Sequence, residues 1–162
     1  MSDADSGAAP ASTPPATPVD YLARYYAREG LKTELHPANK AALLDALAAG
    51  GIVSVVVTFD GCGDSGQIES IDARDAHGEI SLSELEVDLL EPDADGSGVE
   101  TASVPMAEAV ERIAYDLLES LYAGWENNDG AYGEFTFDVP GRAITLDYNG
   151  RYVAVETYSH QF

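Results

Sequence analysis

The sequence predicts an α+β fold built on a mainly antiparallel sheet. The elements expected along the chain, two helices, three strands, one helix and three strands, show no regular βαβ alternation. Residues 104–123 form a long amphipathic pattern with one apolar stripe, which predicts a helix packed on one face of the sheet. The length of 162 residues with 45 % hydrophobic content suits a single domain, expected over residues 18–162.

The N-terminal part is expected to hold a leader and two shorter helices. Residues 1–17 consist, after the first residue, only of small and polar types with Pro, which predicts a disordered leader. The first helix begins at Pro18 and stops at Gly30. The second follows a linker that contains Pro37, is capped by Asn39, and ends at a pair of glycines.

Three strands are expected next. Residues 52–59 are a β-branched run, which predicts a central strand buried on both faces. Residues 67–73 are expected to pair back on it, although the spacing of three between Ile68 and Ile71 breaks a clean alternation. Residues 80–89 alternate in two registers, which predicts one bulged strand followed by a polar loop.

The C-terminal part is expected to be a helix followed by a three-stranded meander. Ser103 is the expected N-cap of the long helix, and Gly124 ends it. The dipeptide Asn149-Gly150 predicts a type I′ hairpin turn. The three strands of the meander are expected over residues 134–139, 143–148 and 151–158.

The charge of the chain is strongly acidic. There are 29 Asp and Glu residues against 8 Lys and Arg residues, a formal net charge of −21. Such a charge disfavours direct binding to nucleic acid or to an anionic membrane and favours a basic protein partner. An acidic surface also serves solubility alone, and that interpretation stays open. The acids expected to bind the partner lie in the middle of the chain and on the outer face of the long helix: Glu84, Glu86, Asp88, Glu108, Glu111 and Glu119.

Two loops rich in Gly and acids, residues 60–67 and 124–134, are the candidate site. Each adjoins an expected strand, so both can meet at one edge of the sheet, and their carboxylate and amide oxygens suit Ca²⁺. The spacing lacks the ligand pattern of an EF-hand, and the Asn, Asp and Gly residues also suit turns, with Trp125 packing the helix end. No metal is assigned. The candidate residues are Asp60, Asp64, Ser65, Trp125, Glu126, Asn127, Asn128, Asp129 and Glu134.

Residues 63–66 resemble the nucleophile motif of trypsin-like serine proteases, but no triad partner accompanies them, so no catalytic residue is assigned. The single cysteine, Cys62, excludes an internal disulfide and favours a reducing compartment. No apolar run reaches the roughly 20 residues that span a bilayer, and no secretory signal is visible. We therefore expect a cytoplasmic protein.

Three segments carry a resemblance to a known family. They are FDGCGDSGQIE at residues 59–69, GWENNDGAYGE at 124–134 and LDYNGRY at 146–152. With these motifs, residues 38–162 resemble an uncharacterised bacterial domain family found on proteobacterial plasmids and other mobile elements. The resemblance implies a small cytoplasmic accessory protein concerned with host defence or plasmid maintenance, and it implies no activity or cofactor.

The sequence leaves two hypotheses for function. The first is a non-enzymatic acidic interaction protein that binds a basic protein partner, such as a nucleic-acid-binding or defence protein, by imitating nucleic acid. The alternative is a small metal-binding or carboxylate-based enzyme whose site lies where the loops 60–67 and 125–134 meet.

Overall fold

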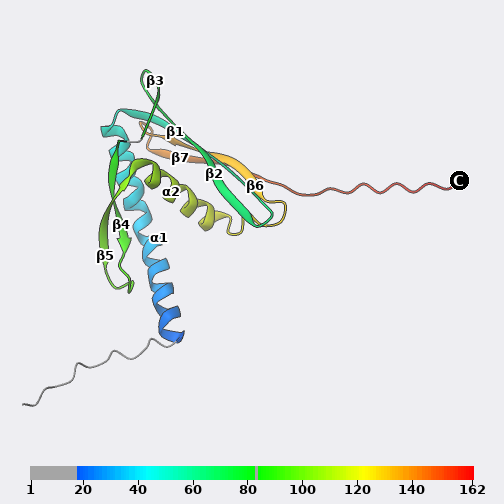
Figure 1. The fold of residues 1–162 in the computed structure, drawn as a ribbon, viewed down its shortest axis with the longest axis horizontal. Helices are drawn as coiled ribbons and strands as arrows, with labels where there is room; N and C mark the ends of the chain where they lie inside the picture. The colour runs from blue at the N-terminus through cyan, green and yellow to red at the C-terminus, as the bar shows by residue number, and fades with distance from the viewer. Residues whose placement is uncertain (1–17, 83) are drawn as a thin grey trace, which may run out of the picture.

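The computed structural model describes residues 18–82 and 84–162, so the predicted leader 1–17 lies outside the described residues. A five-stranded sheet has the order β3-β2-β1-β6-β7, and β4 and β5 form a separate two-stranded sheet. All strand pairs are antiparallel, which confirms the predicted α+β class (Figure 1). The elements are α1 Pro18–Ala49, β1 Ile52–Cys62, β2 Ser65–Asp75, β3 Gly78–Ile80, β4 Glu86–Pro92, β5 Val99–Pro105, α2 Met106–Leu121, β6 Ala131–Asp138 and β7 Ala143–Gly150.

The prediction of two short N-terminal helices is wrong, because α1 is one helix of 32 residues that passes through Gly30 and Pro37. Its second half is held on the core by Leu43 and Leu47, both fully buried. Asn39 is not a cap. Its side-chain amide donates to the carbonyl of Leu90 in β4 and accepts from the Leu90 N–H, both at 2.8 Å. Contact with the β4–β5 hairpin along α1 thus outweighs the local cost of Pro and Gly.

β1 is the middle strand of the large sheet, as predicted, but its burial on both faces is wrong. Buried residues alternate along it with half-buried ones, so the helices cover one face only. β2 pairs with β1 through a register shift, where Thr58 faces Ser70 and Phe59 faces Ile68. The extra residue is a β-bulge, and it brings Ile68 and Ile71 to the same face despite their spacing of three.

The predicted single bulged strand over residues 80–89 is also wrong. Its two registers belong to two strands in different sheets, because β3 ends at Ile80 and β4 begins at Glu86. The polar loop predicted over residues 91–101 includes the end of β4 and the start of β5, and β5 pairs with β4 over its whole length. The turn between them is closed by Asp93, whose Oδ1 accepts from the N–H groups of Asp95 and Ser97 at 3.1 Å.

α2 confirms the predicted amphipathic helix, with shorter bounds than residues 104–123. Pro105, and not Ser103, holds the N-cap position, and it makes no side-chain cap hydrogen bond. Ser103 lies in β5 instead. Leu121, the last residue of the helix, is 61 % exposed.

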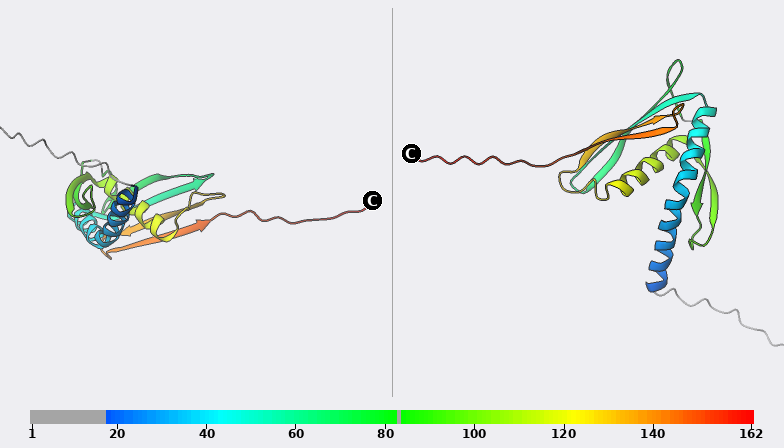
Figure 2. Two further views of the ribbon diagram at one scale, coloured as in Figure 1. Left: turned by 90° about the horizontal axis from the view of Figure 1, so that it is seen from below. Right: turned by 180° about the vertical axis from the view of Figure 1, so that it is seen from behind.

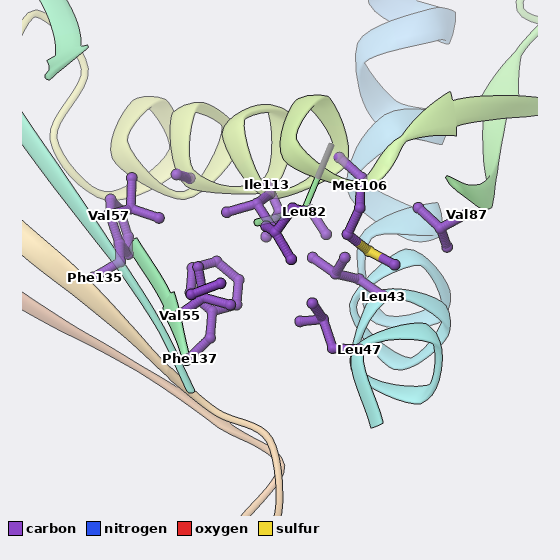
Figure 3. Packing of buried hydrophobic residues seen from close by; sticks show 14 of the residues in the cluster. Leu43, Leu47, Val55, Val57, Leu82, Val87, Met106, Ile113, Phe135 and Phe137 are labelled. Atoms are coloured by element: carbon purple, nitrogen blue, oxygen red, sulfur yellow. The ribbon is translucent and has the colours of Figure 1, made fainter. Parts of the chain in front are cut away.

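The core lies between α2, the covered face of the sheet and the second half of α1 (Figure 3). Phe135 and Phe137 of β6 and Val55 and Val57 of β1 point from the sheet toward α2. Met106 of α2 lies near Leu43 and Val87, which connects the core to α1 and β4. The core is continuous across both sheets, so burial of its apolar surface holds the two sheets in one domain.

The predicted third strand of the C-terminal meander is wrong. β6 and β7 pair as predicted, but residues 151–162 carry no secondary structure and project away from the sheet (Figures 1 and 2). A type I′ turn needs positive φ at both central residues, and neither Asn149 nor Gly150 has one. β7 therefore runs straight through the predicted turn.

Candidate functional site

The two Gly-rich loops lie side by side, although they are far apart in the sequence. The first is the turn between β1 and β2, and the second joins α2 to β6. The Gly63 N–H donates to the carbonyl of Asn128 at 2.9 Å, and the Asp64 N–H donates to the carbonyl of Glu126 at 3.0 Å. The convergence that the sequence left open is therefore present, and it is made by the backbones.

Trp125 occupies the junction of the loops. Its side chain is buried, with 5 % exposed, and its ring lies directly on two glycines of the first loop. A Cβ on Gly66 would stand 2.5 Å from the nearest atom of the Trp125 ring, and one on Gly61 would stand 2.7 Å from it. Phe59 meets the Trp125 ring edge to face, with centroids 5.5 Å apart. Gly61 and Gly66 are thus needed for close packing with Trp125.

The carboxylates of the loops do not converge as the backbones do. Asp60 is bound by Arg151, whose two terminal nitrogens donate to its oxygens at 2.9 and 3.1 Å. This hydrogen bonding to Arg151 lowers the pKa of Asp60. Asp64 and Asp129 are exposed, and Glu134 lies on the open face of the sheet opposite Asp147. Within the described part of the chain, no group of three His, Cys, Asp or Glu side chains is placed to hold a metal ion.

The remaining loop residues mostly build turns. Asp64 and Asn128 have φ values of 66° and 56°, the left-handed conformation that Asn and Asp tolerate best after Gly. The Asn127 N–H donates to the carbonyl of Gly124, and Ser65 is an exposed residue opposite Cys62 in the β1–β2 pair. Glu126 differs from these turn residues, because its Oε2 is buried without a hydrogen-bond partner. It lies at the junction of the loops, since a Cβ on Gly66 would be 3.0 Å from the Glu126 Cβ.

The six acids predicted to bind a partner fall on two separate surfaces. Glu86 and Asp88 are exposed on β4 between the buried residues Val87 and Leu89, so they form the outward face of the hairpin. Glu84 is exposed just before β4. On the other face of β4, which points toward α2, Glu91 forms an ion pair with Arg112 of α2 at 3.5 Å. The other three acids, Glu108, Glu111 and Glu119, lie on α2.

The acids on α2 are partly neutralised. Glu108 accepts from Arg112 at 2.7 Å. Glu119 lines a cleft of about 410 Å³ between α1 and α2, together with Lys32 and His36. This cleft could not be expected from the sequence, because it depends on α1 being one helix that continues past Pro37 beside α2. The outward face of the hairpin is thus the more uniformly acidic of the two surfaces.

A second cleft of about 400 Å³ adjoins the first and is lined by residues of α1, β4 and α2, Arg112 among them. Asp116 lines both clefts, and desolvation there raises its pKa. The charges of Lys32, His36 and Arg112 oppose this rise, while that of Glu29 adds to it. The clefts therefore carry mixed charge.

Comparison with known proteins places the chain in a family. Residues 35–162 match the model of a family of unknown function, DUF6878. The chain belongs to this family. The DUF6878 segment contains both Gly-rich loops and both sheets, while the first half of α1 precedes it. No curated protein and no solved structure matches the chain. Over the described residues, neither helix is both long and apolar enough to cross a membrane.

Proposed function

We propose that this protein is a non-enzymatic, acidic interaction protein that binds a basic protein partner in the cytoplasm. The observation that carries the proposal is the charge of the β4–β5 hairpin. Residues 84–100 contain no Lys, Arg or His, and their acids are Glu84, Glu86, Asp88, Glu91, Asp93, Asp95 and Glu100.

The outward face of the hairpin presents its charge in a regular way. Glu86 and Asp88 alternate with the buried Val87 and Leu89, so their carboxylates project to the same side. Residues two apart on a strand are separated by roughly 6.8 Å, which permits simultaneous pairing with successive cations on a partner. The net charge of −21 adds a long-range field that speeds encounter with a basic protein.

Charge reversal on this face tests the proposal. Proteins captured from the native cell at about 50 mM salt are compared for the wild type, for Glu86→Lys with Asp88→Lys, and for a control variant. The control, Glu134→Lys with Asp147→Lys, changes the net charge equally on the open face of the large sheet. We expect basic proteins to bind the wild type and the control, and to bind the hairpin variant about tenfold more weakly or worse.

Salt provides a second criterion for the same interaction. An interface built on exposed charges weakens steeply when salt shortens the Debye length from roughly 14 Å to below 5 Å. Equal binding by the hairpin variant and the wild type, or binding that is unchanged at high salt, would contradict the proposal. Displacement of the captured partner by duplex DNA would support the finer proposal that the hairpin imitates nucleic acid and serves an anti-defence role.

The alternative function, a metal or carboxylate site at the junction of the loops, is favoured by one observation. Oε2 of Glu126 is buried there without a hydrogen-bond partner. Such an oxygen is a candidate ligand for Ca²⁺. Titration with Ca²⁺, followed by the fluorescence of Trp125, tests this directly, with Glu126→Gln and Asp64→Ala as the variants expected to abolish a response. A wild type that shows neither a fluorescence change nor a thermal shift rejects a Ca²⁺ site at the junction.

A further inference from the structure

The C-terminal segment has the composition of a strand but lies outside any sheet. Residues 151–162 have no secondary structure, yet Val153 and Val155 are 72 % and 81 % exposed, and Tyr152 and Tyr158 are 84 % and 74 % exposed. β-branched and aromatic residues are enriched in strands and disfavour full exposure. This segment, called here the tail, therefore lacks the partner that its sequence suits.

The tail is directed away from its own sheet by an anchor at its first residue. Arg151 donates its N–H to the carbonyl of Gly130 at 2.9 Å, which continues the pairing of β7 with β6. Its guanidinium binds Asp60 and lies over the ring of Tyr132, 4.7 Å from the centroid. With Arg151 held in line with β7, the tail leaves along the strand direction and does not fold back on β7 (Figure 1).

β7 presents an open edge of matching length. It is the last strand of the large sheet and has eight residues, as many as residues 151–158. In an antiparallel pair, alternate residues direct their N–H and C=O groups to the same side. Because Arg151 bonds toward β6, the groups of Ile144, Leu146 and Tyr148 point to the open side. An open edge of this kind is a template for another strand.

The opposite edge of the sheet, which is formed by the short β3 and by the part of β2 that β3 does not cover, is protected and β7 is not. β2 carries a bulge near Glu69, and the N–H of Ile68 donates to the hydroxyl of Tyr115 at 3.0 Å. Acids on β2 add charge to that edge, as is common on edges that avoid pairing. β7 has one acid, Asp147, and none of these devices over its length.

We propose that the tail of one copy adds as a strand to the β7 edge of a second copy, and that the exchange is reciprocal in a two-fold symmetric dimer. Charge favours a second copy over an acidic partner or a strongly basic one. Residues 143–162 contain only two acids, Asp147 and Glu156, and one Arg. The tail of one copy can therefore pair with β7 of another with little local repulsion, although each chain has a net charge of −21. Each chain supplies one donor and one acceptor, so the contact closes on itself.

The first test is the mass in solution. Full-length protein should scatter light as a dimer of about 34 kDa, twice the 17.1 kDa of one chain. A variant truncated after Arg151 should be a monomer. The exposed aromatic patch of α1 is a rival dimer surface, with Tyr21 and Tyr26 each 68 % exposed. Tyr21→Ser with Tyr26→Ser should therefore leave the dimer intact. A monomeric full-length protein, or a dimer that survives truncation, overturns the proposal.

The second test identifies the strands that pair. In the dimer, the amide hydrogens of Ile144, Leu146 and Tyr148 should exchange at least about 100-fold more slowly than in the truncated protein. Those of Thr145 and Asp147, which point to β6, should be protected in both. Slow exchange of the first set in a monomeric full-length protein would mean that the tail folds on its own β7, and would reject the exchange.

The third test separates donor from acceptor. A peptide of residues 151–162 should bind the truncated monomer, protect the amides of Ile144 and Leu146, and at excess convert the full-length dimer to monomers. The same peptide with Val153→Asp and Val155→Asp is the matched control and should do neither. Equal action of both peptides, or of neither, contradicts the pairing of the tail with β7.

Discussion

At the scale of single residues, the contact between Trp125 and the two glycines defines the loop junction. Gly66→Ala should lower the free energy of unfolding by about 1–3 kcal/mol, because the added Cβ meets the Trp125 ring at 2.5 Å and the indole must move. Denaturant unfolding measures the loss, and the fluorescence of Trp125, the only Trp, reports the displaced ring.

Gly30→Ala is the matched control for this prediction. Gly30 lies within α1, and a Cβ there meets nothing within 4 Å. The change should raise the free energy of unfolding by up to about 1 kcal/mol, since Ala is the better helix former. If Gly66→Ala were as neutral or stabilising as Gly30→Ala, the packing role assigned to the loop glycines would be wrong.

Asp116 gives a prediction that depends on pH. Its pKa is raised by desolvation, so the folded state holds the proton more tightly than the unfolded state does. Because the Asp116 side chain is still exposed to solvent, the cost of its ionisation to stability is small. Asp116→Asn mimics the neutral form. Its free energy of unfolding should equal that of the wild type below the unfolded pKa of about 3.9 and exceed it above the folded pKa.

Unfolding curves across this pH range measure the difference between Asp116→Asn and the wild type. Glu111→Gln removes one charge from the exposed face of the same helix and controls for the reduced net charge. If the gain from Asp116→Asn were the same at acidic and neutral pH, desolvation of the carboxylate would not be its cause.

The role of individual site residues could be predicted only where it was local. Trp125, as the only Trp at a helix end, suited a packing anchor, and Asn127, Asn128 and Gly130 suited turns. The bond between Asn128 and Gly63 joins residues 65 positions apart, and nothing in either loop alone specifies it. The partner of Asp60, Arg151, was assigned to a strand and was missed for the same reason.

At the scale of elements, periodicity predicts α2, β6 and β7, because the residues on one face of each are more buried than those on the other, while a β-branched run predicts β1. α1 was divided wrongly, since Gly30 and Pro37 are local breakers whose cost is offset by contacts with β4. β5 was missed because only Val104 in it is buried, so its sequence shows no apolar alternation, and it is stabilised by its pairing with β4. The hairpin turn predicted at Asn149-Gly150 does not form, because the hydrogen bond from the Arg151 N–H to the Gly130 carbonyl continues the pairing of β7 with β6.

The join between α1 and β4 supplies the prediction at this scale. Asn39 pairs with both backbone groups of Leu90 as a neighbouring strand would. Asn39→Leu leaves the N–H and C=O of the half-buried Leu90 without this partner and should lower the free energy of unfolding by about 1–3 kcal/mol. The amide hydrogen of Leu90 should also exchange faster.

Glu34→Ala, at an exposed position on the same helix, serves as the control for Asn39→Leu and should change the free energy of unfolding by less than about 0.5 kcal/mol. Unchanged exchange at Leu90 in the Asn39→Leu variant would show that the hairpin is held to α1 without this pair. The prediction therefore concerns a specific contact and not helix stability in general.

At the scale of the whole molecule, the net charge of −21 acts on folding and on binding in opposite directions. Like charges across the surface repel and destabilise the folded state, and salt screens this repulsion. The melting temperature should therefore rise between about 10 mM and 500 mM salt, while affinity for a basic partner falls over the same range. A protein that loses binding while gaining stability cannot have lost it by unfolding.

The variant with Glu86→Lys and Asp88→Lys completes this argument. It reduces the net negative charge, so its melting temperature at low salt should be at least that of the wild type and should rise less with salt. The Glu134→Lys and Asp147→Lys control should behave alike in stability, because repulsion over a small domain depends mainly on total charge. Differential scanning calorimetry measures both. A hairpin variant that is less stable than the control would show that Glu86 and Asp88 support the fold itself, and its lost binding could then not be assigned to a lost contact with the partner.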